Sequence, residues 1–167
     1  MKVTIDGVEY VPRETFAKKS IADELEKMKP AVEWDSKVGT IQKWYYGSYV
    51  KASWCATTVS YIINKLGKAE VKSDNVYSLM VKLRNSNKGT FYNAEQLKTI
   101  DIKKDDILFF LWAGNKMVET SSKHVSVAYL DNKAGSKTVF AIGGNQKDKI
   151  CTLEYERSKI YGVFRFA

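Results

Sequence analysis

The sequence predicts an α+β domain in which N-terminal helices pack on an antiparallel sheet of five to six strands. The first half of the chain places apolar residues at helical spacing, whereas the part after residue 106 consists of short segments rich in β-branched and aromatic residues. Helices that precede the strands, instead of alternating with them, disfavour a doubly wound parallel sheet. With 167 residues, 44% of them hydrophobic, the chain can bury one core.

The N-terminal segment is predicted to be an extension of the main domain. Residues 2–11 alternate apolar and polar around an Asp-Gly dipeptide, which favours a two-residue hairpin turn. A stripe at helical spacing follows, made of Ala17, Ile21, Leu25 and Met28. We expect residues 1–31 to form a hairpin and helix that either dock on the domain of residues 32–167 or serve as a candidate partner site.

Two further helices are predicted in the middle of the chain. The aromatic-rich stretch 32–49 is interpreted as a linker, and residues 53–67, SWCATTVSYIINKLG, as an amphipathic helix. Ser53 can cap the first turn of this helix, and Gly67 suits a left-handed stop. Apolar spacing indicates another helix over 76–83.

Five strands are predicted after the helices, at residues 106–112, 123–130, 138–142, 149–155 and 160–166. The connections between them are short, which favours antiparallel pairing.

The net charge of +8 indicates attraction to polyanions. Nucleic acid, anionic membranes and wall polymers rich in carboxylate and phosphate all fit such a field. The sequence has no zinc-finger spacing, no RNP-type aromatic motif and no basic heptad region, so we expect no nucleic-acid partner. The alternative is that the lysines only keep the surface soluble.

Several classes of protein are disfavoured by what the sequence lacks. No window has the roughly 18 apolar residues of a membrane span, and the first ten residues lack the apolar region of a secretory signal. We therefore expect a protein made in the cytoplasm without a signal peptide. Cys55, Cys151 and a single histidine lack metal-site spacing, so neither a metal nor a cofactor is predicted.

Three residues form a candidate catalytic set. Cys55 lies at the start of the predicted helix 53–67, His124 on a predicted strand, and Asn145 after the next strand, in the run AIGGNQ. A thiol at a helix N-terminus, a base and an amide that orients the base are the parts of papain-like nucleophilic catalysis. We expect the helix end and the histidine to lower the pKa of Cys55. Taken singly, each residue is more often structural than catalytic.

Four stretches in chain order resemble one family: WCATTVSYIINKLG, KKDDILFF, KHVSVAYL and AIGGNQKDKICTLEYERSKIYGVFRF. They are similar to motifs of the CHAP-type and NlpC-type cysteine amidases and endopeptidases of bacterial cell walls, especially small phage endolysins. The resemblance runs from about Gly39 to the C-terminus and implies a papain-like fold. It also implies a peptidoglycan hydrolase made in a host bacterium's cytoplasm and acting at the cell wall.

The resemblance gives each candidate residue a role. It implies Cys55 as nucleophile, His124 as general base and then acid, and Asn145 as the group that orients the imidazole. By analogy, Gln42 and Tyr45 are candidates for the second oxyanion donor, whereas Tyr46, Trp54 and Trp112 are candidates for lining a substrate groove. An aromatic residue in such a run is also often part of the core.

The chain departs from the family pattern at three positions. Asp105 stands where the family often has glycine before Asp-Ile, and Lys123 where it has glycine before the histidine. Gly143 stands where some CHAP enzymes carry a glutamate, so a triad is favoured over a quartet. The Asp-rich calcium loop of certain CHAP lysins has no counterpart, which agrees with the expectation of no metal.

Other functions remain compatible with the sequence. One is a non-catalytic module that binds cell wall or nucleic acid with the same fold. Others are a cysteine enzyme that transfers the acyl group to an amine instead of water, and a secreted antibacterial amidase. The complete Cys, His and Asn set favours an enzyme.

Overall fold

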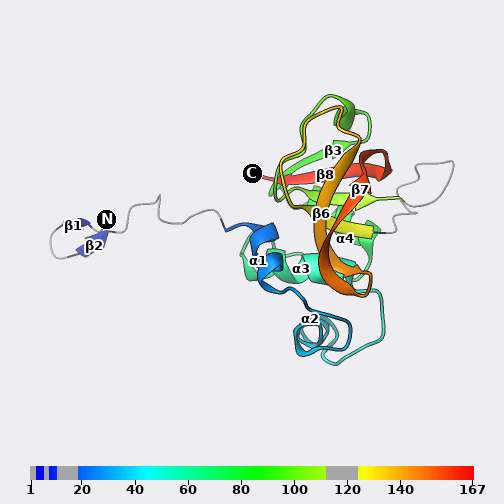
Figure 1. Cartoon of the computed structure of the whole chain (residues 1–167). Helices are drawn as coiled ribbons and strands as arrows, with labels where there is room; N and C mark the ends of the chain where they lie inside the picture. The colour runs from blue at the N-terminus through cyan, green and yellow to red at the C-terminus, as the bar shows by residue number, and fades with distance from the viewer. Residues whose placement is uncertain (1–2, 6–7, 11–18, 112–123) are drawn as a thin grey trace.

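The computed structural model of the chain describes residues 3–5, 8–10, 19–111 and 124–167, and it confirms the α+β class. The described helices are α1 (Ile21–Lys27), α2 (Ser36–Tyr46), α3 (Cys55–Lys65) and α4 (Val76–Arg84), with short 3₁₀ turns η2 (Gln96–Lys98) and η4 (Arg157–Lys159). Figure 1 shows the helices on one side of the strands, with α3 next to the sheet and α2 farther out. Helix α3 contacts β5, β6 and each of the other three helices, so it forms the centre of the helical layer.

The main sheet has six antiparallel strands in the order β3-β8-β4-β5-β6-β7. Their bounds are β3 Gly89–Asn93, β4 Ile107–Phe110, β5 His124–Ala128, β6 Thr138–Gln146, β7 Lys149–Glu156 and β8 Ile160–Phe166. Five of these strands, β4 to β8, match predicted segments. Strand β3 was not predicted, because it is short and follows a sequence rich in turn residues. A separate hairpin of β1 (Val3–Ile5) and β2 (Val8–Tyr10) pairs as the Asp-Gly turn predicts.

The segment 32–49, predicted as a linker, contains helix α2. Glycine, β-branched and aromatic residues give it low helix propensity, so no local pattern marks it. Its ends are well defined, because the Asp35 carboxylate accepts hydrogen bonds from two first-turn amides and Gly47 ends the helix at φ +79°. Burial of Val38 and Ile41 in the core shared with α3 stabilises the helix. Tertiary packing therefore overrides propensity here.

Helix α3 begins two residues later than the predicted cap. Trp54 occupies the N-cap position without a side-chain hydrogen bond, and Ser53 lies outside the helix. The carbonyl of Trp54 accepts hydrogen bonds from the Thr58 amide at 3.1 Å and the Thr58 hydroxyl at 2.6 Å. At the other end Gly67 has φ +65°, as predicted for a left-handed stop. Cys55 is consequently the first residue of the helix.

Helix α1 belongs to the core of the main domain. Ile21, Ala22 and Leu25 are fully buried in the same cluster as α3, so this part of the N-terminal extension docks on the core. Asp105 holds the start of α1, because its Oδ1 accepts hydrogen bonds from the Ser20 hydroxyl and the Ala22 amide, each at 2.8 Å. Asp105 itself has φ +73°, a conformation that glycine adopts at lower cost.

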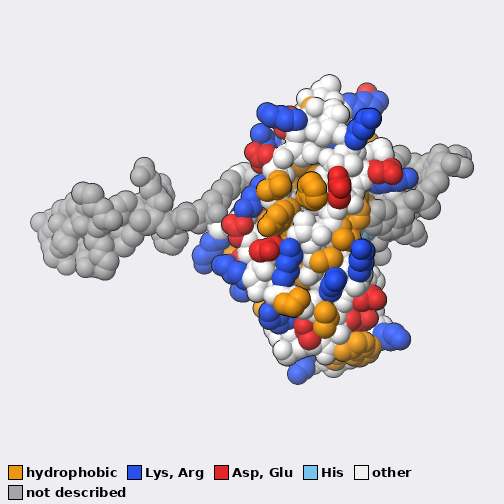
Figure 2. Space-filling model, viewed as in Figure 1, with side chains coloured by type: hydrophobic (Ala, Val, Ile, Leu, Met, Phe, Trp, Pro, Cys, Tyr) orange, Lys and Arg blue, Asp and Glu red, His pale blue; other side chains and the backbone are white. Residues whose placement is uncertain are grey.

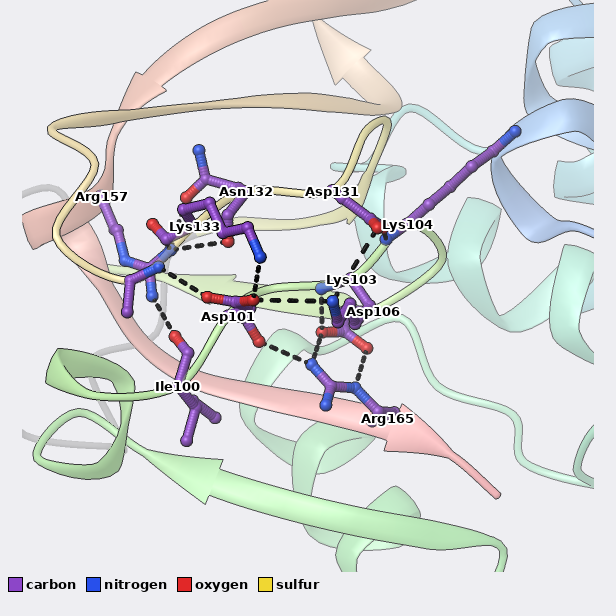
Figure 3. Close-up of polar contacts among 11 residues, drawn as sticks. Ile100, Asp101, Lys103, Lys104, Asp106, Asp131, Asn132, Lys133, Arg157 and Arg165 are labelled. Atoms are coloured by element: carbon purple, nitrogen blue, oxygen red, sulfur yellow. Dashed lines mark hydrogen bonds and ion pairs between the residues drawn. The ribbon is translucent and has the colours of Figure 1, made fainter.

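Charged side chains join the loops at one end of the sheet (Figure 3). The carboxylate of Asp106, 1% exposed, accepts two hydrogen bonds from Arg165, at 2.8 and 2.7 Å. Arg157 donates to the backbone carbonyls of Leu97 and Ile100 at 2.8 and 2.6 Å. These paired groups have a structural role, because the protein itself satisfies the donors.

Two glycines let β6 pack closely on its neighbours. A Cβ on Gly143 would lie 2.6 Å from the Ser126 hydroxyl oxygen of β5, so no glutamate fits at this position. A Cβ on Gly144 would lie 2.3 Å from the Thr58 hydroxyl oxygen and 2.8 Å from the Trp54 ring of α3. The first turn of α3 therefore sits directly on the end of β6.

Replacement of Gly144 by Ala should destabilise the fold by about 1–3 kcal/mol, because the added methyl group has no space. Gly39→Ala is the matched control, since its Cβ would meet only the Tyr49 ring at 3.6 Å, an ordinary contact. Removing glycine from the interior of α2 should stabilise the protein by up to about 1 kcal/mol. Urea unfolding of both variants measures the two opposite signs, and equal stabilities would contradict the packing described.

Candidate active site

Cys55 lies where α3 meets β5. Its side chain is 3% exposed, and its sulfur receives a hydrogen bond from the backbone amide of Val125, the residue that follows His124. The Ser53 hydroxyl lies 3.9 Å from the sulfur. The structure thus places the thiol against the same peptide unit that carries His124.

The pKa of Cys55 differs in direction from the prediction. Burial raises it above its ordinary value of 9.0, although hydrogen bonds from Val125, Ser53 and the first-turn amides of α3 act in the opposite direction. The sequence-based expectation of a lowered pKa considered the helix end but not the removal of the sulfur from water. Desolvation disfavours the charged form and outweighs the helix end here. The thiol is therefore neutral in the free protein at pH 7.

His124 is held by polar groups from three strands, β5, β6 and β7. Its ring is 6% exposed, with Nε2 3.0 Å from Gln146 Oε1 and 2.8 Å from Ser126 Oγ. The phenol oxygen of Tyr155 lies 3.5 Å from the same nitrogen. Burial lowers the pKa of His124 from its ordinary value of 6.5, and the bond to Gln146 acts against this change. The imidazole is therefore neutral at pH 7.

The amide of Gln146 determines which nitrogen of His124 carries the proton. Gln146 Nε2 donates hydrogen bonds to the carbonyls of Cys151 at 2.6 Å and Ala141 at 3.3 Å, which directs Oε1 toward His124. Because Oε1 can only accept, Nε2 of His124 must be the protonated nitrogen. The Ser126 hydroxyl also donates to Oε1. The bond between His124 and Gln146 therefore fixes the tautomer of the imidazole.

In the structure Gln146, and not Asn145, forms the hydrogen bond to His124. The predicted assignment of this contact to Asn145 is therefore corrected. Asn145 has φ +57°, and its Nδ2 donates to the Ser53 hydroxyl at 3.2 Å. The pairing of β6 with β7 shifts register between Gly143 and Gln146, so simple alternation fails at this bulge. The run of two glycines and an asparagine could have indicated an irregular strand, but not which amide faces the histidine.

The other predicted site residues have different surroundings. Trp54 is 1% exposed in the core, which corrects its assignment to a groove; it is buried because β6 packs on the first turn of α3. The phenols of Tyr45 and Tyr46 donate to the carboxylate of Asp74, at 3.2 and 3.0 Å. Burial, followed by Asp74, raises the pKa of Tyr46 to about 12. Trp112 and Lys123 lie outside the described residues.

Gln42, predicted as a candidate for the second oxyanion donor, is buried in the helical layer. It is 1% exposed on α2, which packs on α3. Within the described residues, its Oε1 and Trp54 Nε1 are the two buried side-chain atoms without a hydrogen-bond partner. The unpartnered Oε1 is an acceptor and gives no support to a donor role, so that role of Gln42 stays a prediction.

The described part of the chain contains no cluster of metal-ligating side chains and no helix that is long and apolar enough to cross a membrane. No protein-family model and no curated protein matches the chain. The functional argument therefore depends on the site itself.

Alkylation of the native protein tests the raised pKa of Cys55. Iodoacetamide at pH 7 should label the half-buried Cys151 before Cys55, and the Cys55 rate should rise only as the pH passes 9.0. Peptide mapping by mass spectrometry measures the labelling rates of Cys151 and Cys55. In the Cys151→Ser variant the rate of Cys55 is measured alone. Rapid labelling of Cys55 at pH 6 would show that its pKa is lowered instead.

Proposed function

We propose that the protein is a papain-like cysteine hydrolase that cleaves an amide bond of bacterial peptidoglycan. The observation that carries the proposal is the tautomer of His124 that Gln146 fixes, on the strand whose Val125 amide bonds to the Cys55 sulfur at the start of α3. A buried histidine with only a structural role does not need its protonated nitrogen specified by an amide that two carbonyls orient. Cys55, His124 and Gln146 form the proposed catalytic set.

The neutral thiol and imidazole define how the reaction starts. The imidazole of His124 removes the thiol proton as the Cys55 sulfur attacks the carbonyl carbon of the scissile amide. Backbone amides in the first turn of α3, together with the Gln42 side chain, are candidates to stabilise the negative charge on the carbonyl oxygen. Gln146 Oε1 accepts from His124 Nε2 throughout and stabilises the imidazolium that forms.

The second half of the reaction returns the groups to their starting state. The imidazolium of His124 gives its proton to the leaving amine as the carbon–nitrogen bond breaks, which leaves an acyl group on Cys55. His124 then removes a proton from water, whose oxygen attacks the thioester carbon. The carboxylic acid product leaves, and the thiol regains its proton from His124.

Peptidoglycan is the proposed substrate for two reasons. The sequence motifs resemble those of cell-wall amidases and endopeptidases, and the net charge of +8 attracts the carboxylates and phosphates of wall polymers. A protein of this kind would act at the wall of a bacterium, after release from the cytoplasm as a phage lysin. A module that only binds the wall would not require the ordered His124 tautomer.

Four substitutions test the catalytic set. Cys55→Ala and His124→Ala should abolish the release of muropeptides from purified walls, and Gln146→Ala should slow it by about tenfold or more. Asn145→Gly is the matched control next to Gln146, because glycine tolerates φ +57° and only the contact with Ser53 is lost. Its rate should stay within about threefold of the wild type.

Mass spectrometry of the released muropeptides identifies the bond that is cut through its new termini. A rate for Cys55→Ala equal to that of the wild type would remove the mechanism. A larger loss in Asn145→Gly than in Gln146→Ala would return the orienting role to Asn145. Products that join two stem peptides would show acyl transfer instead of hydrolysis.

The pH dependence of kcat/KM tests whether the reacting groups start neutral. Activity should fall on the acid side only below pH 6.5, since burial lowers the pKa of His124 and a protonated imidazole cannot accept the thiol proton. It should fall on the alkaline side only above pH 9.0, since burial raises the pKa of Cys55 and a thiolate no longer supplies a proton for the leaving amine. A narrow optimum near pH 5 would indicate a preformed thiolate–imidazolium pair.

A further inference from the structure

Trp34 has an unusual backbone conformation for a bulky residue. Its φ is +74°, and its side chain is 60% exposed in the loop between α1 and α2. Glycine or asparagine would adopt this conformation at a lower cost in free energy, so the turn alone does not explain a tryptophan. Strained residues of this kind concentrate at functional sites.

The ring of Trp34 is held in one orientation by Tyr49. The two rings stack with centroids 4.6 Å apart and an angle of 20° between their planes. The backbone amide of Trp34 donates a hydrogen bond to the Tyr49 hydroxyl at 2.8 Å. Tyr49 in turn lies next to Gly39 of α2, where an added Cβ would be 3.6 Å from its ring. An exposed and prearranged aromatic surface results.

The loop that carries Trp34 is bound to the hairpin of the candidate active site. The amide of Glu33 donates to the carbonyl of Asp148 at 2.8 Å, and the amide of Ile150 donates to the carbonyl of Ala31 at 2.8 Å. Asp148 lies two residues after Gln146, in the turn between β6 and β7. The aromatic pair and the catalytic amide are therefore attached to the same hairpin.

Tyr49 is connected to the site from the other direction. It lies in the loop after α2, four residues before Ser53, whose hydroxyl contacts both Cys55 and Asn145. Figure 2 shows hydrophobic side chains at the surface toward the lower end of the view, where Figure 1 places α2. One segment that holds the aromatic pair is thus bound to the β6–β7 turn, and the other continues to Ser53 and the candidate nucleophile.

The surroundings of the pair favour a neutral ligand with a flat apolar face. Glu33 and Asp35 flank Trp34 in the chain, and Asp148 and Lys147 lie in the turn that binds this loop. A nucleic-acid strand needs an unbroken positive groove beside its stacking residues, which this mixture of charges does not supply. A pyranose ring has one face of C–H groups that stacks on an aromatic ring, and its hydroxyls can bond to nearby carboxylates.

We infer that Trp34 and Tyr49 form a sugar-binding platform that holds an N-acetylated sugar of a glycan strand beside the catalytic hairpin. Its role as a substrate subsite rests on the function proposed above, whereas the binding itself does not. The platform would position the glycan, so that the attached peptide enters the site at Cys55. Trp34 is a binding residue in this inference and takes no part in the chemical step.

Binding of tetra-N-acetylchitotetraose to the full chain tests the inference by isothermal titration calorimetry. The probe contains no stem peptide, so its binding does not depend on amide hydrolysis. Trp34→Gly should weaken the affinity at least tenfold, although it relieves the backbone strain at this position. Tyr49→Ala should weaken the affinity by a similar factor. Phe140→Ala is the matched control, because Phe140 is an aromatic residue that is 46% exposed at another position. The Phe140→Ala variant should bind the sugar with the affinity of the wild type.

A measurement on the unmodified protein complements the variants. The indole N–H resonance of Trp34, assigned with Trp34→Phe, should shift on addition of the sugar. Absence of binding, wild-type affinity in Trp34→Gly or an unshifted indole resonance would each overturn the platform. The platform would also be overturned if the protein bound oligodeoxythymidylate through Trp34 and did not bind the sugar. If the sugar binds but the wild-type protein releases no muropeptides, the platform holds and the proposed function fails. If the wild type hydrolyses walls and Trp34→Gly does so at the same rate, the role as a substrate subsite fails.

Discussion

The close contact between the first turn of α3 and strands β5 and β6 is the constraint on which the rest of the structure depends. Gly143 and Gly144 allow it, because any side chain at either position would overlap Ser126, Thr58 or Trp54. The contact buries Trp54 and places Cys55 against the Val125 amide. It therefore sets both the core of the helical layer and the position of the candidate nucleophile.

Burial explains the electrostatics of the site. Close packing removes Cys55 and His124 from water, which raises the pKa of one and lowers that of the other, so both are neutral at pH 7. In the reaction proposed above, a neutral pair needs a base with the correct tautomer more than it needs a stabilised thiolate. Gln146 supplies this through an amide whose donors and acceptor all have defined partners.

Backbone strain is concentrated near this hairpin. Among the described residues, six other than glycine have positive φ, and four of them lie in the β6–β7 turn region or in the loop bound to it: Trp34, Asn145, Lys147 and Asp148. At the other end of the sheet, the Asp106–Arg165 pair and the contacts of Arg157 fix the loops with satisfied hydrogen bonds. The molecule thus has one end stabilised by paired charges and another end with a hairpin turn, in which Lys147 and Asp148 have the positive φ that a two-residue turn requires.

The sequence by itself determined the α+β class, helices α3 and α4 and most strands, because hydrophobic periodicity and chain order are local properties. It also marked Cys55 and His124 as catalytic candidates, which remains a prediction. Helix α2 and strand β3 were not predicted from the sequence. Helix α2 is stabilised by burial against α3, and β3 by pairing with β8, which is distant in the chain. Only the tertiary structure decided that Gln146, and not Asn145, faces His124, because a bulge reverses the expected alternation. The same is true of the pKa of Cys55 and the stacking of Trp34 on Tyr49, which depend on burial and on contacts between segments far apart in the chain.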